Sequence, residues 1–213
     1  MDAELKQRVG KVIRLLKRAY PDAKCSLNHS NAFELLIATI LSAQCTDARV
    51  NIVTQDLFRK YRKPEDYLNV LPKELQQDIR TTGFFRNKTT SIQGAAKVLH
   101  EQYGDQVPQT MDELLELPGV ARKTANVVLG NAFGLSAGVV VDTHVTRLSH
   151  RLGFSEQKTA EKIEQDLIKL VPKKFWTLWS HWLIWHGRRR CNARKPDCSN
   201  CEVKDLCPSA GKV

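Results

Sequence analysis

Apolar residues recur along most of this chain at the three- to four-residue spacing of α-helices. Residues 5–20 are predicted to form an amphipathic helix, with Val9 and Leu16 on the apolar face and Lys and Arg side chains opposite. Residues 31–44 are more apolar throughout, which predicts a buried helix. Further helices are expected over residues 47–61, 64–70, 72–82, 87–103, 142–152, 155–170 and 173–186.

A tight turn separates two shorter helical patterns in the middle of the chain. Thr110 and Glu113 have capping-box spacing, so a short helix is expected to begin there. The Pro118-Gly119 pair stops it, and a second helix is expected over residues 121–129. Such a turn presents main-chain N–H groups at a helix N-terminus, where anions bind. An ordinary helix-turn-helix corner is the alternative for this motif taken alone.

Strand signals are nearly absent. Only residues 138–141, a short valine-rich run, predict a strand. The chain has no internal repeat, no low-complexity tract and no Ser/Gly-rich linker. The predicted fold class is therefore all-α.

Composition narrows the possible partners and compartments. The chain has 213 residues, 42% of them hydrophobic, and no apolar run long enough for a membrane span. Its first residues include acids and lack the apolar core of a signal peptide, so an intracellular protein is expected. The net charge of +10 favours a polyanionic partner, although membrane surfaces and ribosomes also attract basic proteins.

Lys123 is the first candidate for chemistry, because it lies in the first turn of the helix after the Pro-Gly turn. Positive charge near a lysine disfavours its ammonium form. A neutral amine is a nucleophile that can attack a sugar or carbonyl carbon to give a Schiff base. The alternative is a solvated surface lysine, which is common in a chain this basic.

Asp142 is the second candidate. It follows three valines and precedes Thr143 and His144, which is typical of a helix N-cap. Capping is the ordinary role of such an aspartate. A capping carboxylate can also face a cleft.

Four of the six cysteines, Cys191, Cys198, Cys201 and Cys207, are separated by six, two and five residues. In an intracellular protein, cysteines clustered in this way bind metal more often than they form disulfides. Zinc sites more often use two close cysteine pairs, whereas this set has one C-x-x-C. No histidine lies among them, which favours an all-thiolate site.

Three motifs, in order, carry a family resemblance: LPGVARKTANVVL, then VDTHVTRLSHRLG, then the four cysteines. Together they resemble the endonuclease III family of base-excision DNA glycosylases, over essentially the whole chain. The resemblance implies a helix-hairpin-helix at residues 114–129, Lys123 as the attacking amine and Asp142 as the catalytic carboxylate. It also implies that the cysteines hold a [4Fe-4S] cluster.

The resemblance further implies two helical lobes that flank a cleft, with Lys123 on one wall and Asp142 on the other. Residues 23–137 would form a helical bundle domain that contains the hairpin. Residues 1–22 and 138–213 would form the iron-sulfur cluster domain. Nothing in the hydrophobic periodicity alone marks this division.

Six residues are expected to contact DNA. Gly119 and Ala121 lie at the hairpin, where the family usually has LPGVG; the alanine methyl is expected to alter the phosphate contacts slightly. Phe84 suits an apolar wedge, although the family more often has leucine there, and Gln44 suits a contact to the base left behind. Arg194 and Lys195 lie between the first two cysteines and could bind phosphate.

Other aromatic and basic residues have plainer interpretations. Core packing is the alternative for Phe84. Trp176, Trp179, Trp182 and Trp185 recur every third residue and are expected to form a buried helix face rather than a platform for bases. The Arg188–190 run either binds phosphate or is solvated.

The resemblance implies a bifunctional DNA N-glycosylase/AP lyase that removes oxidised pyrimidines and nicks the strand by β-elimination through a lysine Schiff base. Its expected partner is double-stranded DNA containing a damaged base or an abasic site. We also expect a monomer that binds no membrane and works in the cytoplasm or nucleoid of a prokaryote.

Two alternatives remain at this point. Monofunctional relatives, such as the adenine-specific branch, typically lack the hairpin lysine. A non-catalytic DNA-binding or redox-sensing module would need neither Lys123 nor Asp142. The cluster itself could staple a small lobe or carry electrons.

Overall fold

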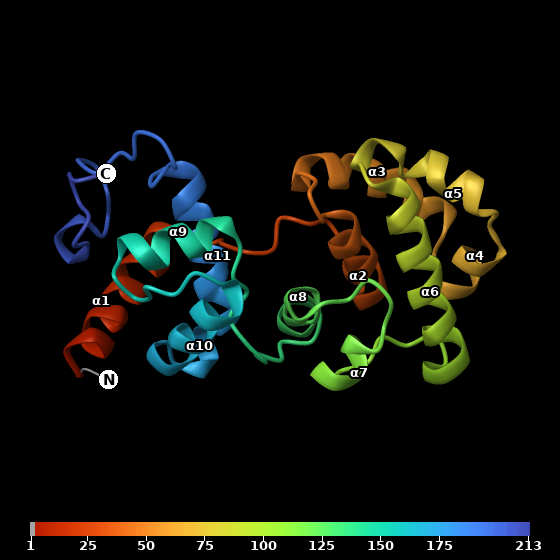
Figure 1. The fold of residues 1–213 in the computed structure, drawn as a ribbon, viewed down its shortest axis with the longest axis horizontal. Helices are drawn as coiled ribbons and strands as arrows, with labels where there is room; N and C mark the ends of the chain where they lie inside the picture. Colours follow the sequence, from red (N-terminus) through yellow and green to blue (C-terminus); the bar gives the residue numbers. More distant parts are fainter. Residues whose placement is uncertain (1–2) are drawn as a thin grey trace. The chain divides into compact units, whose positions relative to one another are not determined.

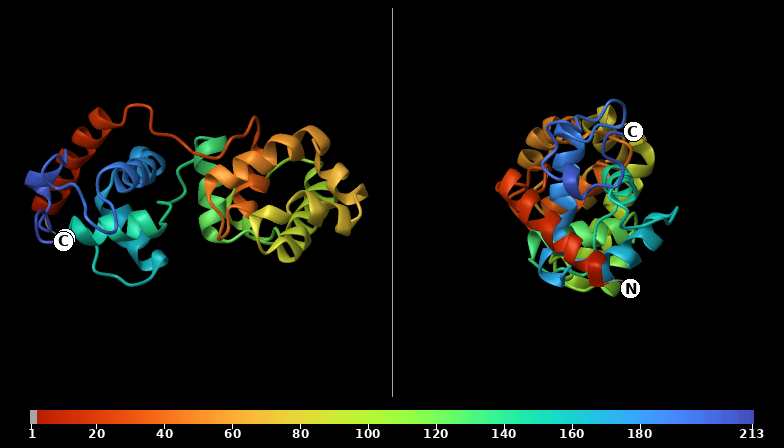
Figure 2. Two further views of the ribbon diagram at one scale, coloured as in Figure 1. Left: turned by 90° about the horizontal axis from the view of Figure 1, so that it is seen from above. Right: turned by 90° about the vertical axis from the view of Figure 1, so that its left-hand side faces the viewer.

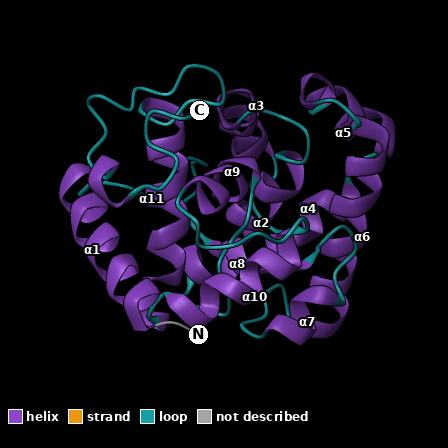
Figure 3. Cartoon of the chain, turned by 60° about the vertical axis from the view of Figure 1, so that its left-hand side comes forward, coloured by secondary structure: helices purple, strands orange, loops and turns teal. Residues whose placement is uncertain are grey.

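A computed structural model of the chain describes residues 3–213, and over these residues it consists of helices and loops without a β-strand (Figure 3). The described chain divides into two compact units. One unit is Cys25–Ala137, and the other combines the segment up to Lys24 with Gly138–Val213. None of the described helices is long and apolar enough to cross a membrane.

The unit Cys25–Ala137 is built around the helix α2 (Ala32–Leu41). Asn31 caps this helix by accepting a hydrogen bond from the Glu34 N–H at 2.9 Å, and the residues from Leu35 to Leu41 are buried. Helices α6 (Phe85–Tyr103) and α8 (Arg122–Ala132) pack against it (Figure 1). The helices that complete the unit are α3 (Asp47–Lys60), α4 (Pro64–Asn69), α5 (Pro72–Asp78), α6 (Phe85–Tyr103), α7 (Met111–Leu115) and α8 (Arg122–Ala132), with a 3-10 turn η1 at Arg80–Thr82.

The second unit packs α1 (Ala3–Ala19), α9 (Thr143–Arg151), α10 (Ala160–Leu170) and α11 (Trp176–Arg189) around a separate apolar core. Trp179 and Trp182 are buried in that core, and Trp176 and Trp185 pack partly buried against it. The prediction of a buried tryptophan face is therefore confirmed.

The last part of this unit, residues 190–213, is almost entirely loop, with one 3-10 turn at Lys204–Leu206. Arg8 of α1 donates hydrogen bonds to the carbonyl oxygens of Leu152 and Leu206, which ties the loop to two helical segments. Figure 2 shows this end of the chain, in blue, beside α1, in red.

The helix predictions are correct in number and order, and several boundaries are not. Helix α2 ends at Leu41, three residues before the predicted end, because Gln44 adopts a left-handed φ of 53°. Helix α10 begins at Ala160 rather than residue 155, because the Thr159 side chain caps it. The strand predicted at residues 138–141 is wrong: Val139, Val140 and Val141 are buried in a loop, and the structure has no β-strand among the described residues.

Candidate active site and cysteine site

The predicted hairpin is present between α7 and α8. Thr110 caps α7 by accepting from the Glu113 N–H at 3.3 Å, as the capping-box spacing predicted. The Val120 N–H bonds to the Leu117 carbonyl at 3.0 Å, which closes the turn. Gly119 has a φ of +78°, a conformation that glycine adopts without strain.

The turn rests on small residues of α6. A Cβ added to Gly119 would lie 2.5 Å from the Cβ of Ser91, and one added to Gly94 would lie 3.0 Å from the Pro118 ring. Ser91 and Gly94 are three residues apart and therefore share a helix face. This close packing against α6 fixes the position of the hairpin. The only sequence signal for the contact is a pair of small residues at helical spacing, Ser91 and Gly94.

Ala121 is the N-cap of α8, with φ −93° and ψ 168°. This extended conformation suits alanine, so the departure from the family's glycine strains nothing. No side chain caps the helix, and its first returning hydrogen bond runs from the Ala125 N–H to the Ala121 carbonyl at 3.0 Å. Main-chain N–H groups in the first turn of a helix have no partner within the helix, and anions bind at such positions.

Lys123 is the second residue of α8, in the first turn as predicted. Its side chain is exposed, and its amine makes no hydrogen bond or ion pair with the described residues. A lysine with these surroundings is free to reach a ligand held at the helix N-terminus.

Asp142 is the N-cap of α9, also as predicted. Its Oδ1 accepts from the Val145 N–H at 2.8 Å, which fixes the side chain, and the residue is half-buried. Its Oδ2 accepts no hydrogen bond from the part of the chain that the structure describes. One oxygen thus orients the carboxylate, while the other is left for a ligand.

The first turn of α9 is braced by α11. The Nη2 of Arg147 donates to the carbonyl oxygens of Gly187, at 2.9 Å, and Cys191, at 3.0 Å, and lies 3.1 Å from the His144 Nδ1. A Cβ on Gly187 would lie 2.8 Å from that Nδ1. Glycine at position 187 therefore allows α11 to pack closely against the first turn of α9, which Asp142 caps. In this packing, burial lowers the pKa of the His144 imidazole.

Gln44 and Phe84 occupy two exposed loops of the unit Cys25–Ala137. Both residues have left-handed backbone conformations, with φ of 53° and 47°. The Phe84 side chain is 60% exposed, so the alternative of core packing is wrong for this residue. A left-handed backbone conformation is costly for a bulky residue, and such strain clusters at functional sites.

The four C-terminal cysteines line one pocket. The space between its atoms is about 410 Å³, including the open mouth, and Arg151, His186 and Arg190 also line it. Burial raises the pKa of the Cys201 thiol to about 11 and also raises that of Cys207. Buried thiols that resist ionisation become stable thiolates when a metal centre neutralises their charge.

The spacing of the thiols bears on the kind of metal. Sulfur atoms around one tetrahedral zinc lie about 3.8 Å apart, given Zn–S bonds of about 2.3 Å. Among the described residues, no three of these four sulfur atoms lie within 4.8 Å of one another, the only such group of potential ligand atoms being that of His186, Cys201 and Glu202. The four sulfur atoms are therefore not arranged as they would be around one tetrahedral zinc ion.

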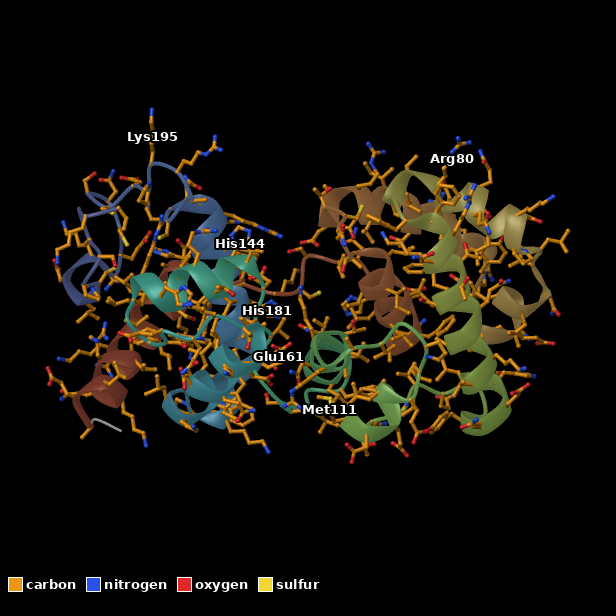
Figure 4. The ribbon with its side chains drawn as sticks, in the orientation of Figure 1. Arg80, Met111, His144, Glu161, His181 and Lys195 are labelled. Atoms are coloured by element: carbon orange, nitrogen blue, oxygen red, sulfur yellow. The ribbon has the colours of Figure 1, made fainter. Side chains whose placement is uncertain are left out.

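The loop between Cys191 and Cys198 presents Arg194 and Lys195, both of which are exposed. Lys195 has a left-handed φ of 55°, and its side chain projects away from the ribbon (Figure 4). The exposed positions agree with the predicted role in binding phosphate, which the structure by itself leaves as a prediction.

Sequence reasoning missed the arginines that hold this loop. Arg151 donates to the carbonyl oxygens of Asn192, at 2.7 Å, and Ala193, at 3.0 Å, and to the Cys191 Sγ, at 3.2 Å. Arg190 forms ion pairs with Asp197, at 2.6 Å, and Glu202, at 3.2 Å. Arg190 is therefore neither a free phosphate ligand nor a solvated side chain. For Arg151, the only signal in the sequence is its helical spacing from Arg147.

Comparison with known proteins gives consistent matches. The model of the HhH-GPD superfamily of base excision DNA repair proteins matches residues 37–173. Endonuclease III of Synechocystis sp. is 52% identical over 208 residues, which cover 98% of this chain and 95% of that protein.

Two solved structures match almost the whole chain. A non-covalent endonuclease III–DNA complex has a TM-score of 0.92 and 48% identity, and a trapped endonuclease III–DNA covalent intermediate has a TM-score of 0.91 and 47% identity. Each comparison covers 97% of both chains.

Proposed function

Because the chain belongs to the endonuclease III family, within the HhH-GPD superfamily of base excision DNA repair proteins, we propose that its Lys123 and Asp142 carry out the chemistry of that family. The protein is a DNA glycosylase with AP lyase activity, which removes oxidised pyrimidines and then nicks the strand. The observation that best supports the assignment is the free, exposed amine of Lys123 at the uncapped start of α8.

In the proposed first step, the neutral amine of Lys123 attacks C1′ of the damaged nucleotide. The C1′–N bond breaks, and the base leaves with the bonding electron pair and takes up a proton. The new secondary amine loses a proton, the sugar ring opens with protonation of its ring oxygen, and a Schiff base forms between C1′ and the lysine nitrogen. The attack needs a lysine without a competing ion pair, which is how Lys123 stands here.

Strand cleavage follows from the Schiff base. Its electron-withdrawing nitrogen acidifies the C2′ hydrogen, and loss of that proton expels the 3′-phosphate by β-elimination. Water then hydrolyses the imine and regenerates Lys123.

Asp142 is proposed to stabilise the positive charge that develops on the sugar and to assist the proton transfers. The hydrogen bond from the Val145 N–H holds one carboxylate oxygen, so the orientation of the other is set before the substrate binds. An asparagine at this position could still cap α9, because asparagine and aspartate are similar N-caps, but it would lack the negative charge.

The partner is duplex DNA that contains a damaged base or an abasic site. We propose that Gly119, Ala121 and the first turn of α8 bind a backbone phosphate through main-chain N–H groups. Phe84 would fill the gap in the base stack, and Gln44 would contact the base left opposite it. Arg194 and Lys195 would contact phosphate. The protein would act as a monomer inside the cell.

We further propose that Cys191, Cys198, Cys201 and Cys207 ligate a [4Fe-4S] cluster. When bound, the cluster would supply four strong bonds that fold residues 191–207 around it, a structural role that needs no electron transfer. Arg151 would then support one ligand directly through its hydrogen bond to the Cys191 sulfur.

A nicking assay tests this function. The protein should cleave a duplex with one abasic site and leave a β-elimination product, and Lys123→Gln should lower the rate at least a thousandfold, the usual scale for a lost nucleophile. Asp142→Asn should slow removal of an oxidised pyrimidine more than it slows cleavage of a preformed abasic site. Lys123→Gln nicking at the wild-type rate would show that the amine has been assigned wrongly.

A further inference from the structure

We propose that Lys88 is a positioning residue for two loops, the one after Leu41 that carries Gln44 and the one after Thr82 that carries Phe84. It holds the two loops at a fixed spacing, so that the side chains of Gln44 and Phe84 enter the DNA together. The inference rests on the proposed function, because it takes Gln44 and Phe84 as the residues that fill the gap in the duplex. Lys88 itself is given no contact with DNA and no chemical step.

The side chain of Lys88 is nearly inaccessible, at 4% exposure, and lies within α6. Its Nζ donates one hydrogen bond to the Leu41 carbonyl oxygen at 2.8 Å and another to the Thr82 carbonyl oxygen at 2.7 Å. Since one nitrogen atom holds both oxygens, the main chain at Leu41 and the main chain at Thr82 are brought close together.

Both acceptors are the last residues of helical segments. Leu41 ends α2, and Thr82 ends the 3-10 turn η1. Carbonyl groups at helix ends have lost their helical partners and attract cations. Lys88 satisfies both ends with one amine, at the points from which the two loops leave their helices.

The two loops need such support because of their backbone conformations. Gln44, three residues after Leu41, and Phe84, two residues after Thr82, both have left-handed φ angles, which are costly for side chains of this size. Conformations of this kind persist only when the surrounding structure determines them. The double hydrogen bond from Lys88 fixes the start of each loop.

Other roles for Lys88 fit poorly. Both of its hydrogen-bond acceptors are main-chain carbonyl groups, and no carboxylate pairs with its amine among the described residues, so it is not part of a salt bridge. Its burial leaves it unable to bind phosphate, and burial also lowers the pKa of its amine. A charged group is expensive to bury, so its position calls for a structural reason.

The test compares cleavage of duplex abasic DNA with cleavage of single-stranded abasic DNA by the complete protein. Only the duplex requires a gap to be opened and filled. Lys88→Met keeps the length of the side chain and removes both hydrogen bonds. It should lower the duplex to single-strand rate ratio about tenfold, the same direction and scale as Phe84→Ala, with single-strand cleavage unchanged within about twofold.

Gln93→Met provides a matched control on the same helix. The Gln93 Nε2 also donates to two main-chain carbonyl groups, those of Tyr67 in α4 and of Val70 at its C-cap, both at 3.0 Å, but it supports neither Gln44 nor Phe84. This variant should lose comparable stability yet keep the wild-type rate ratio. The inference about Lys88 is wrong if Lys88→Met has the same duplex to single-strand rate ratio as Gln93→Met while Phe84→Ala lowers that ratio. If Phe84→Ala itself leaves the ratio unchanged, the failure lies in the assigned wedge, and the inference falls with it.

A second measurement covers the case in which Lys88→Met does not fold. In the otherwise wild-type protein, Gln44→Ala and Phe84→Ala are combined in a double-mutant cycle on the duplex rate. If Lys88 links the loops, the double variant should be slower than the poorer single variant by less than about twofold. Independent effects that multiply fully would overturn the proposal.

Discussion

The hairpin between α7 and α8 and the loop between Cys191 and Cys198 both present main chain and basic side chains to solvent, but they are held in place differently. The hairpin rests on Ser91 and Gly94 of α6, above a continuous apolar core. The loop between Cys191 and Cys198, called the cysteine loop below, contains no helix. Its course is determined by hydrogen bonds and ion pairs from Arg151 and Arg190 and by the four cysteines that line the pocket.

This difference indicates what each part needs in order to keep its shape. Apolar packing stabilises the hairpin whether or not a ligand is bound. Arginine hydrogen bonds to main-chain carbonyl groups orient the loop between Cys191 and Cys198, but four half-buried thiols without a metal leave its centre without strong bonds. The cysteine loop should therefore respond to loss of its metal centre, and the hairpin should not.

Cys198→Ser should have the largest effect. Loss of one ligand should remove the cluster, its visible absorbance and most of the soluble yield, because ligation contributes on the order of 10 kcal/mol in small metal-dependent folds. Limited proteolysis of the remaining soluble protein should cut first within residues 191–213 and leave Cys25–Ala137 intact.

Cys25→Ser is the matched control, because Cys25 belongs to the other unit. This substitution should leave the colour and the soluble yield of the protein unchanged. Wild-type protein that is colourless and active with stoichiometric zinc would contradict the assigned cofactor.

Gly119→Ala tests the hairpin side of the comparison. A residue with a Cβ at φ +78° costs roughly 1–2 kcal/mol, and the contact with Ser91 adds about 1–3 kcal/mol. Fluorescence anisotropy should show affinity for abasic duplex reduced by a factor of ten to a hundred, with the visible absorbance of the cluster retained.

Ala121→Gly is the control for the hairpin, since Ala121 is exposed and in an extended conformation. It should bind DNA nearly as the wild type does. Equal affinities for Gly119→Ala and the wild type would remove the hairpin from the DNA-binding surface.

Phe84→Ala should have a smaller and more selective effect. The side chain is 60% exposed, so the free energy of unfolding should change by no more than about 0.5 kcal/mol. Cleavage of damaged duplex should fall about tenfold, while cleavage of single-stranded abasic DNA should be unaffected. A loss of about 3–5 kcal/mol in chemical denaturation would instead identify Phe84 as a core residue.

Much of this arrangement was predictable because it depends on local sequence. Helical periodicity gave the helices, the Thr110–Glu113 spacing gave the start of α7, and the position of Asp142 after three valines gave the N-cap of α9. Each of these features is determined by residues within a few positions of one another.

The parts that could not be predicted depend on contacts between distant residues. Arg8 bonds to the Leu206 carbonyl across 198 positions, and Lys88 bonds to that of Leu41 across 47. In the sequence, both look like ordinary solvated cations. The valine run at residues 138–141 has strand propensity, but a strand requires a partner strand, and the same apolar residues are buried here in a loop.

Low pH should destabilise the unit that contains the cysteine loop, and we expect this effect to be the smallest of those predicted here. Burial lowers the pKa of His181 on α11 to about 4. The unfolded chain takes up a proton near pH 6.5 and the folded chain only near pH 4, so stability falls as the pH decreases between these values. Allowing for partial exposure, urea unfolding should show a loss of about 1 kcal/mol between pH 6.5 and 5.

His181→Gln should reduce that pH dependence without abolishing it, because burial also lowers the pKa of His186 to about 4. A slope identical to that of the wild type would assign the acid sensitivity to other groups.

Borohydride trapping tests the central claim, that Lys123 is the attacking amine, most directly. Hydride reduces a Schiff base to a stable secondary amine, so incubation with abasic duplex and borohydride should give a covalent complex whose adduct maps to the peptide containing Lys123. Lys123→Gln should give no complex and still bind the duplex, because main-chain N–H groups hold the phosphate, whereas Asp142→Asn should retain some trapping on preformed abasic sites. Normal trapping by Lys123→Gln, with the adduct on another amine, would contradict the account.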